Sequence, residues 1–265
     1  MAASRIDRTF ARLHDQHRGG MVTYVTAGDP DADTSAKILI ALAEAGADVL
    51  EVGVPFSDPL ADGPVIQRAT ERALAAGMTL RGTLAVVRAV RRAVDTPIVL
   101  FTYANPVVRM DADVFAREAK EAGVDGVLIL DYPVEEAGPL RASLLAAGLD
   151  PIFLISPTTS EERIRRSGEL GRGFLYVISR LGVTGVRDSL DGDASALVNR
   201  VRAQSRLPVA LGFGISSPAQ VAQACASADA AVVGSALVQV IADRGAARDV
   251  AERAGEYVRW LKSEV

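Results

Sequence analysis

The sequence predicts an α/β protein built as a (β/α)8 barrel, because three observations agree. Eight short runs rich in β-branched residues alternate with amphipathic segments of helical length. A unit of helix, small-residue turn, aspartate and β-branched run recurs at 44–51, 121–128 and 226–233, which is typical of parallel βα units. The 265 residues contain no Pro/Gly/Ser-rich linker, so we expect a single domain over residues 1–265. An open, doubly wound sheet stays the alternative.

The predicted elements follow one another along the chain. An extra N-terminal helix carries Ile6, Phe10 and Leu13 at helical spacing and should cover the barrel floor. Strands are expected at Met21–Thr26, Val49–Val54, Pro97–Thr102, Gly126–Leu130, Pro151–Ile155, Phe174–Ile178, Pro208–Leu211 and Ala230–Val233. Helices are expected between them at Thr34–Ala45, Leu80–Val94, Asp113–Ala122 and Glu135–Ala147. Extra helices are predicted after strand 2, at Ile66–Ala75, and after strand 8, where Ser235 could cap a short helix.

The overall composition argues against several classes of partner. The net charge is −4 and the chain has no basic run, so neither nucleic acid nor an anionic membrane surface is an expected partner. No apolar run approaches the roughly 18 residues that cross a bilayer, and the N-terminus lacks an apolar signal core. The lone Cys225 cannot form an internal disulfide. We therefore expect a cytoplasmic protein.

The few lysines and histidines narrow the possible chemistry. Lys37, Lys120 and Lys262 all fall in helical segments, so no lysine is placed on a strand for Schiff-base chemistry. The two histidines, His14 and His17, both fall in the predicted first helix, so a catalytic metal held by histidines is not expected. Catalysis must then depend on carboxylates, hydroxyls and backbone groups.

The second predicted strand carries an acidic side chain on its inner face. Alternation places Glu51 with Val49 and Gly53 on one face, and Leu50 and Val52 on the other. In a closed barrel that first face is the interior, where an unpaired carboxylate is unfavourable by several kcal/mol, about the effective penalty for a buried ion. A carboxylate in that position indicates catalysis rather than structure.

The loops after strands 6 to 8 carry backbone donors suited to a phosphate. Gly214 follows strand 7, and Gly234 and Ser235 follow strand 8, the usual phosphate position in such barrels. Gly185 lies after strand 6, in a polar segment at 179–188 long enough to be a lid. Simple chain turns and an ordinary exposed connection are the alternatives.

Five motifs in this order resemble those of the tryptophan synthase alpha subunit family, nearly end to end. They are TAGDP at 26–30, EVGVPFSDPLADGP at 51–64, YANP at 103–106, SRLGVTG at 179–185 and GFGIS at 212–216. The resemblance implies a TIM barrel and a carbon–carbon lyase of tryptophan biosynthesis. Such an enzyme cleaves indole-3-glycerol phosphate to indole and glyceraldehyde 3-phosphate by a retro-aldol step, with no cofactor and no metal in this subunit.

The resemblance also implies roles for individual residues. Glu51 would protonate the indole C3 and help remove the proton from the side-chain hydroxyl, and Asp62 would accept the ring N–H. Tyr176 would orient Glu51 or the substrate, although it could simply be a packing residue. The further implied positions are an indole pocket of Tyr24, Phe101, Tyr103, Leu128 and Leu154, lid residues Arg180 and Thr184, and partner contacts Asp58, Asn105, Pro106 and Pro133. Taken singly, the pocket positions also fit plain barrel core, and the contact positions fit ordinary turns.

The family works as an allosteric alpha-beta-beta-alpha complex, so the resemblance implies a pyridoxal-phosphate beta subunit as partner. A stand-alone indole-3-glycerol phosphate lyase, a non-catalytic activator of a beta subunit and another phosphate-binding barrel enzyme, such as a sugar-phosphate isomerase, stay open. Leu130, Tyr132 and Leu181 depart from the family pattern at the pocket edge and the lid.

Overall fold

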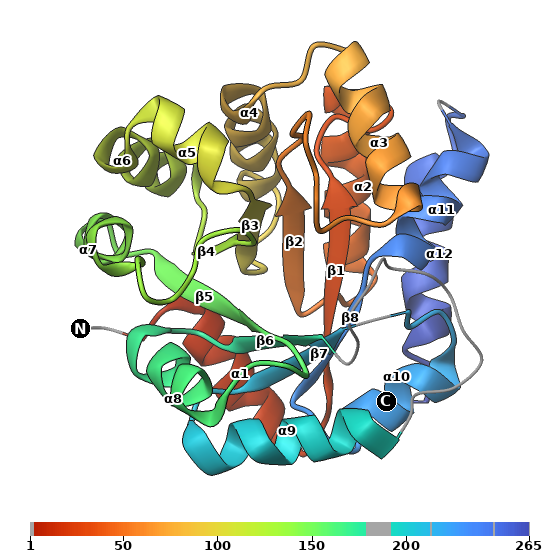
Figure 1. The fold of residues 1–265 in the computed structure, drawn as a ribbon. Helices are drawn as coiled ribbons and strands as arrows, with labels where there is room; N and C mark the ends of the chain where they lie inside the picture. The colour runs from red at the N-terminus through yellow and green to blue at the C-terminus, as the bar shows by residue number, and fades with distance from the viewer. Residues whose placement is uncertain (1–2, 179–191, 213, 246, 265) are drawn as a thin grey trace.

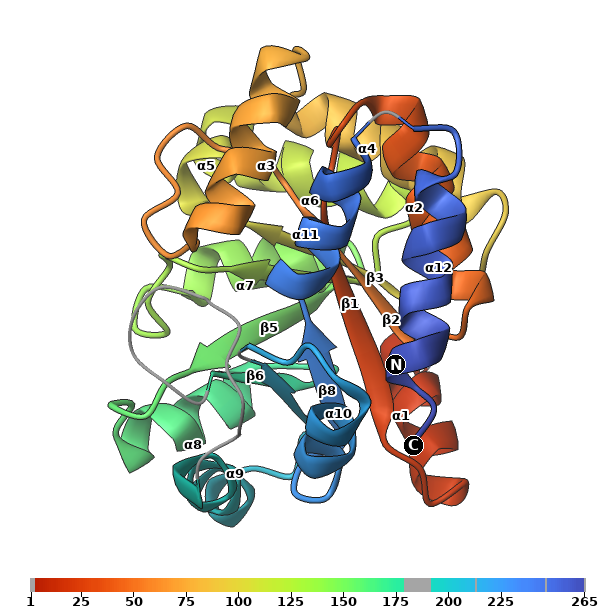
Figure 2. The same ribbon diagram turned by 90° about the vertical axis from the view of Figure 1, so that its right-hand side faces the viewer.

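Eight parallel strands close into a barrel in chain order, with β8 pairing to β1 (Figures 1 and 2). The computed structural model describes residues 3–178, 192–212, 214–245 and 247–264. The strands are β1 (Gly20–Thr26), β2 (Val49–Gly53), β3 (Ile98–Thr102), β4 (Gly126–Ile129), β5 (Asp150–Ile155), β6 (Leu175–Ile178), β7 (Val209–Gly212) and β8 (Ala230–Val233). The predicted (β/α)8 barrel is confirmed, and the open sheet is wrong.

Helices surround the barrel, and some connections carry two of them. They are α1 (Arg5–Asp15), α2 (Ala32–Glu44), α3 (Pro64–Ala75), α4 (Leu80–Arg91), α5 (Ala104–Met110), α6 (Ala112–Ala122), α7 (Gly138–Ala146), α8 (Glu161–Leu170), α9 (Gly192–Gln204), α10 (Pro218–Cys225), α11 (Ser235–Arg244) and α12 (Val250–Leu261). The predicted extra helices at the N-terminus and after strands 2 and 8 are α1, α3 and α11. Helix α5 was not predicted, because only a turn was expected there. Pro106 is tolerated there because the first-turn N–H groups have no intrahelical acceptor.

The alternation predicted for β2 is present. Val49 belongs to the cluster of side chains inside the barrel, whereas Leu50 and Val52 pack in the outer layer between strands and helices. Glu51 lies opposite Tyr24 of β1 and Val99 of β3 in the strand register. Because side chains alternate, Glu51 shares the inner face with Val49.

Helix α1 covers the floor of the barrel, on the opposite side from the loop that joins β2 to α3 (Figure 2). Its buried Ile6, Phe10 and Leu13 join the interior cluster, and the ring of Phe10 lies 5.5 Å from that of Phe174. The helix ends at Asp15, so the prediction that His17 lies in it is wrong. His17 instead turns the chain with φ +50°, which a helix cannot contain.

The recurring aspartate has a common structural role at the floor. In each case the Oδ2 of the aspartate accepts a backbone N–H from the first or second residue of the neighbouring strand. The donors are Met21 for Asp48 at 3.0 Å, Ile98 for Asp125 at 2.9 Å and Val209 for Asp229 at 2.7 Å. Each aspartate thus ties its own strand to the start of an adjacent strand. The repeated sequence unit therefore produces the same kind of contact between neighbouring strands at three places in the barrel.

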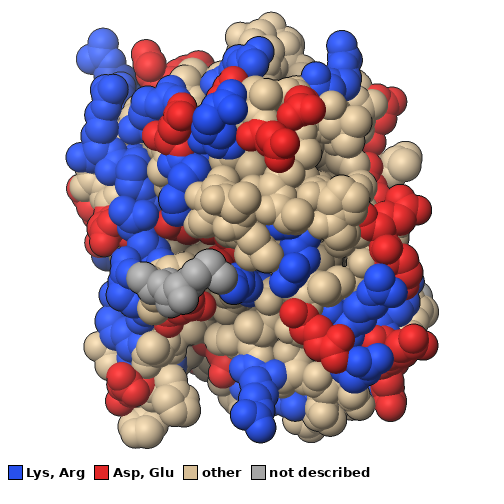
Figure 3. Space-filling view, turned by 90° about the vertical axis from the view of Figure 1, so that its left-hand side faces the viewer, with Lys and Arg blue, Asp and Glu red and all other residues tan. Residues whose placement is uncertain are grey.

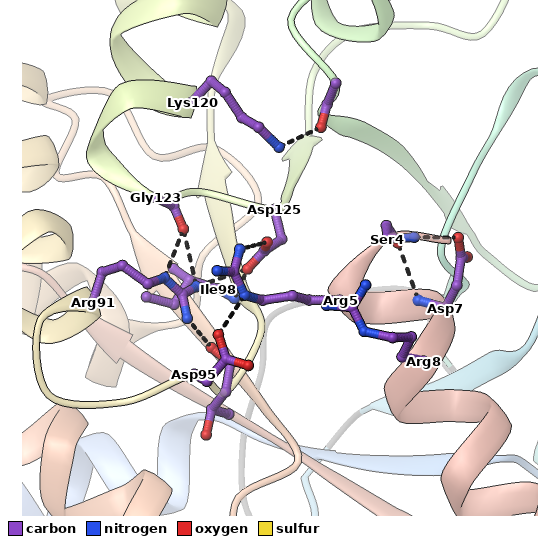
Figure 4. Close-up of polar contacts among 12 residues, drawn as sticks. Ser4, Arg5, Asp7, Arg8, Arg91, Asp95, Ile98, Lys120, Gly123 and Asp125 are labelled. Carbon is purple, nitrogen blue, oxygen red and sulfur yellow. Dashed lines mark hydrogen bonds and ion pairs between the residues drawn. The ribbon is translucent and has the colours of Figure 1, made fainter. Parts of the chain in front are cut away.

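Arginines neutralise these floor aspartates. Figure 4 shows Arg5 of α1 and Arg91 of α4 converging on Asp125, at 3.0 and 2.7 Å. The Arg91 guanidinium also donates to the Gly123 carbonyl. Burying an ionised carboxylate is unfavourable unless it is paired in this way. Asp150, which opens β5, has no hydrogen-bond partner for its Oδ2 in the part of the chain that the structure describes, and burial raises its pKa.

Charged side chains of both signs cover the outside of the molecule. On the face in Figure 3, Lys and Arg gather along one edge, while the middle is mostly uncharged. Within the described residues no single helix is long and apolar enough to cross a bilayer. Only α3 and α4 together reach that length and composition, and they meet at 97°.

Candidate active site

Glu51 is completely buried in the interior of the barrel, and neither carboxylate oxygen has a hydrogen-bond partner among the described residues. Burial, followed by the nearby charge of Asp62, raises its pKa from 4.5 to about 8. Removal from water disfavours the charged form, and a second carboxylate disfavours it further. Glu51 therefore carries a proton at neutral pH and can act as an acid.

Asp62 lies in the loop between β2 and α3, two residues before Pro64, which begins α3. The hydroxyl of Tyr103 donates to its Oδ2 at 3.1 Å and accepts the Ala61 N–H at 3.1 Å. The Gln67 side chain donates to the Asp62 carbonyl at 2.8 Å. Burial raises the Asp62 pKa to about 6 even though the Tyr103 hydrogen bond lowers it. Asp62 is therefore mostly ionised at pH 7.

Both carboxylates open into one cavity of about 140 Å³ at the barrel mouth. It is lined by Tyr24, Glu51, Ala61, Asp62, Ile66, Phe101, Leu130, Leu154, Tyr176, Ile178, Gly214, Val232, Gly234 and Ser235. The Phe101 ring lies 5.1 Å from that of Tyr24, edge to face, and 6.5 Å from that of Tyr176. An apolar, aromatic wall with two differently protonated carboxylates suits a flat aromatic substrate that must gain a proton.

Glycines leave room for two tyrosine hydroxyls in this cavity. A Cβ on Gly53 would lie about 2.1 Å from the Tyr24 hydroxyl, and one on Gly212 about 2.9 Å from that of Tyr176. The negative charge of Glu51 raises the pKa of Tyr176, after the larger effect of burial. Tyr176 thus lies where it can act on Glu51 or on a bound molecule.

The polar end of the cavity is formed by backbone. Gly214 has φ +73°, a conformation that favours glycine. Gly234 is the N-cap of α11 and Ser235 is its first residue, so the N–H groups of the first turn, which have no acceptor within the helix, lie at the cavity. The prediction that Ser235 caps this helix is wrong, since Gly234 holds that position without a side-chain hydrogen bond.

The structure brings together most of the predicted site residues. The predicted residues that line the cavity are Glu51, Asp62, Tyr176, Tyr24, Phe101, Leu154, Gly214, Gly234 and Ser235. Tyr103 lies behind Asp62 rather than in the cavity wall, and Leu128 belongs to the interior cluster below it. Arg180, Thr184 and Gly185 lie outside the described residues.

The predicted partner-contact residues lie on loops and helix starts that follow β2, β3 and β4. Asp58 is exposed and its Oδ2 accepts the Ser57 hydroxyl at 2.6 Å. Asn105 is exposed in the first turn of α5, where Pro106 is half-buried, and Pro133 is half-buried in the loop after β4. The roles of these residues stay predictions.

Sequence reasoning missed several cavity residues. Ala61 precedes Asp62 and Ile66 follows it by four residues, so both could have been predicted from their closeness to Asp62 in the sequence. Ile178 and Val232 lie on the inward faces of their strands. Leu130 was noted only as a departure from the family pattern, and it lines the cavity. The hydrogen bond from Tyr103 to Asp62 joins residues 41 positions apart and left no local signal.

In the described part of the chain, no three His, Cys, Asp or Glu side chains are arranged to hold a metal. A family model described as Tryptophan synthase alpha chain matches residues 10–264. The chain belongs to the tryptophan synthase alpha chain family. The resemblance inferred from the motifs is thereby confirmed.

Named relatives of the family match nearly the whole chain. The tryptophan synthase alpha chain of Burkholderia thailandensis is 48% identical over 267 residues, covering 99% of this chain and 97% of the relative. That of Methylibium petroleiphilum is 52% identical over 240 residues, covering 90% and 88%.

Solved structures of the family share the fold. Tryptophan synthase subunit alpha from Legionella pneumophila superposes with a TM-score of 0.91 at 38% identity, covering 99% of this chain and 98% of that one. A chain of Mycobacterium tuberculosis tryptophan synthase gives 0.92 at 40% identity, covering 100% and 99%. The barrel and its extra helices are thus common to these relatives.

Proposed function

We propose that this chain, as a single barrel domain, cleaves indole-3-glycerol phosphate to indole and glyceraldehyde 3-phosphate in tryptophan biosynthesis. One observation carries the proposal: a protonated Glu51 and an ionised Asp62 share one aromatic cavity beside the N-terminus of α11. The reaction needs an acid for a ring carbon, an anion for the ring nitrogen and donors for a phosphate. The cavity offers all three, with no cofactor required of this subunit.

In the proposed mechanism Glu51 donates its proton to C3 of the indole ring. The bond from C3 to the side-chain carbon then breaks, its electrons return to the ring, and the neighbouring hydroxyl becomes the aldehyde as its proton passes back to Glu51. The residue is thus restored in one turnover. General acid–base help of this kind contributes roughly 10²- to 10⁴-fold to the rate.

Asp62 stabilises the positive charge that C3 protonation places on the ring. Its carboxylate accepts the indole N–H, and that hydrogen bond strengthens as the nitrogen becomes cationic. Stabilisation that is larger in the intermediate than in the substrate lowers the barrier. Tyr103 supports this role, because its hydrogen bonds hold both the Asp62 carboxylate and the Ala61 amide.

The substrate phosphate would bind at the backbone of Gly214, Gly234 and Ser235, with Gly185 as a further donor. The first-turn N–H groups of α11 and the positive end of its dipole favour an anion there. Arg180 and Thr184 are proposed to belong to a lid, and Thr184 would reach Asp62 when the lid closes. The phosphate end and the aromatic end of the cavity then fix the orientation of the substrate.

We further propose a cytoplasmic complex with a pyridoxal-phosphate tryptophan synthase beta subunit, as an alpha-beta-beta-alpha assembly. Leu60 is 92% exposed beside Asp58, and Val108 is 65% exposed on α5 near Asn105. A partner seated on this side of the barrel would cover both of these exposed apolar side chains. Pro106 and Pro133 would extend the same contact.

Indole release from indole-3-glycerol phosphate tests the proposal, measured with the purified chain alone and after adding a tryptophan synthase beta subunit. Slow release that rises sharply with the beta subunit is the expected result. Fast release without a partner would indicate a stand-alone lyase. Absence of release in both assays would leave either a non-catalytic activator or a different barrel enzyme, and would refute the proposed reaction.

A further inference from the structure

The connection between β7 and α10 is held from outside the barrel by a residue of the C-terminal helix. The hydroxyl of Tyr257, on α12, donates to the backbone carbonyl of Ser216 at 3.0 Å, across 41 residues of sequence. Helix α12 packs beside α11 and also contacts α10 (Figure 1). The connection that contributes Gly214 to the cavity is therefore tied to an element far from it in sequence.

The backbone N–H of Ser216 is also held by a hydrogen bond. The Oε1 of buried Gln220 accepts the Ser216 N–H at 2.8 Å and its hydroxyl at 3.2 Å. Ser217 caps α10, and Ile215 is buried in the outer core. Gly214 is thus the part of this segment that lines the cavity, while Ile215 is buried and Ser216 is hydrogen-bonded at both its N–H and its carbonyl.

The Tyr257 hydroxyl can donate this hydrogen bond throughout the neutral pH range. Burial raises the pKa of its hydroxyl to about 12, so the proton stays on through the neutral range. The ring of Trp260 lies 5.4 Å from that of Tyr257, one turn further along α12, and restricts its position.

We propose that Tyr257 is a positioning residue for phosphate binding. By holding the Ser216 carbonyl it keeps Gly214 in its φ +73° conformation, in the wall of the cavity that the N-terminus of α11 also lines. The inference rests on the proposed phosphate site at Gly214, Gly234 and Ser235. It predicts that a residue outside the cavity selectively sets the affinity for the phosphate half of the substrate.

The test uses Tyr257→Phe, which keeps the ring and removes only the hydroxyl. Calorimetric titrations with glycerol 3-phosphate and, separately, with indole are made on the wild-type chain and the variant. We expect the Kd for glycerol 3-phosphate to rise about fivefold, the value of one ordinary hydrogen bond, and the Kd for indole to stay unchanged. In turnover, KM for indole-3-glycerol phosphate should rise while kcat changes less than about twofold.

Ser227→Ala is the matched control, because it also removes a hydroxyl that donates to a backbone carbonyl, that of Ala224 at 3.3 Å, but at the far end of α10 from Ser216. It should leave both affinities unchanged. Equal weakening of both ligands by Tyr257→Phe, or unchanged affinity for glycerol 3-phosphate, would overturn the positioning role. Failure of the wild-type chain to bind glycerol 3-phosphate would instead refute the proposed phosphate site, and the inference with it.

Discussion

The surroundings of Glu51 and Asp62 give these two similar carboxyl groups different pKa values. Both are buried, but among the described residues only the carboxylate of Asp62 receives a hydrogen bond, from Tyr103. Their pKa values are therefore about 8 and about 6, which makes one an acid and the other an anion at neutral pH. A pair with such separated values can divide proton donation and charge stabilisation between its members.

Replacing Glu51 by Gln should lower kcat by about 10²-fold or more, because the amide cannot donate a proton to carbon. The same variant should be more stable than wild type at pH 8.5, by on the order of 3 kcal/mol, because a buried unpaired charge is removed. The folded-state pKa lies above the ordinary 4.5, so stability falls as pH rises from about 4.5 to about 8. Thermal unfolding at pH 4.5 and 8.5 checks this. A variant less stable at both pH values would indicate a structural role for Glu51.

The dependence of kcat/KM on pH should be bell-shaped, with flanks near pH 6 and pH 8. The acid flank reports protonation of Asp62 and the alkaline flank reports loss of the Glu51 proton. In Tyr103→Phe the hydrogen bond that lowers the Asp62 pKa is gone, so the acid flank should move to higher pH. Steady-state rates from pH 5 to 9 decide this. If the acid flank stays at the same pH in the variant, protonation of Asp62 does not set that flank.

At the scale of the elements, the aspartates of the barrel floor join neighbouring strands of the closed barrel. Asp125 accepts the N–H of Ile98 and pairs with Arg5 and Arg91, so one side chain links β3, α1 and α4 at the start of β4. The same position in the repeated unit is filled by Asp48 and Asp229. A local sequence motif thus encodes a contact between elements that are distant in sequence.

Asp125→Ala should destabilise the protein by roughly 3 to 5 kcal/mol, because it leaves a partly buried Arg91 without its carboxylate and an N–H without its acceptor. Asp95→Ala is the control: Asp95 pairs with the same Arg5 at 2.6 Å, but its side chain is 82% exposed, so the loss should be under about 1 kcal/mol. Chemical denaturation of both variants measures the difference. Equal losses would show that Asp125 has no special role at the floor.

At the scale of the whole molecule, the sequence predicted best those features of fold and site that depend on residues close together in the chain. The inward direction of Glu51 followed from alternation in one strand, and the position of Asp62 from a continuous motif. The short helix α5 was missed because YANP also fits a turn. The contacts of Tyr103 and Tyr257 were missed because each joins residues about 40 positions apart, and only the closed barrel brings them together.

The exposed residues beside the mouth lead to a prediction for the assembly. Leu60 is 92% exposed in the loop that also holds Asp62, so a partner that covers Leu60 can act on the catalytic loop directly. Leu60→Asp should place a charge in the proposed interface and weaken partner binding by about 10-fold or more. Titrating a beta subunit against the rate of indole release measures this. Because Leu60 does not line the cavity, the variant should regain full stimulation at high beta concentration, whereas unchanged half-saturation would place the interface elsewhere.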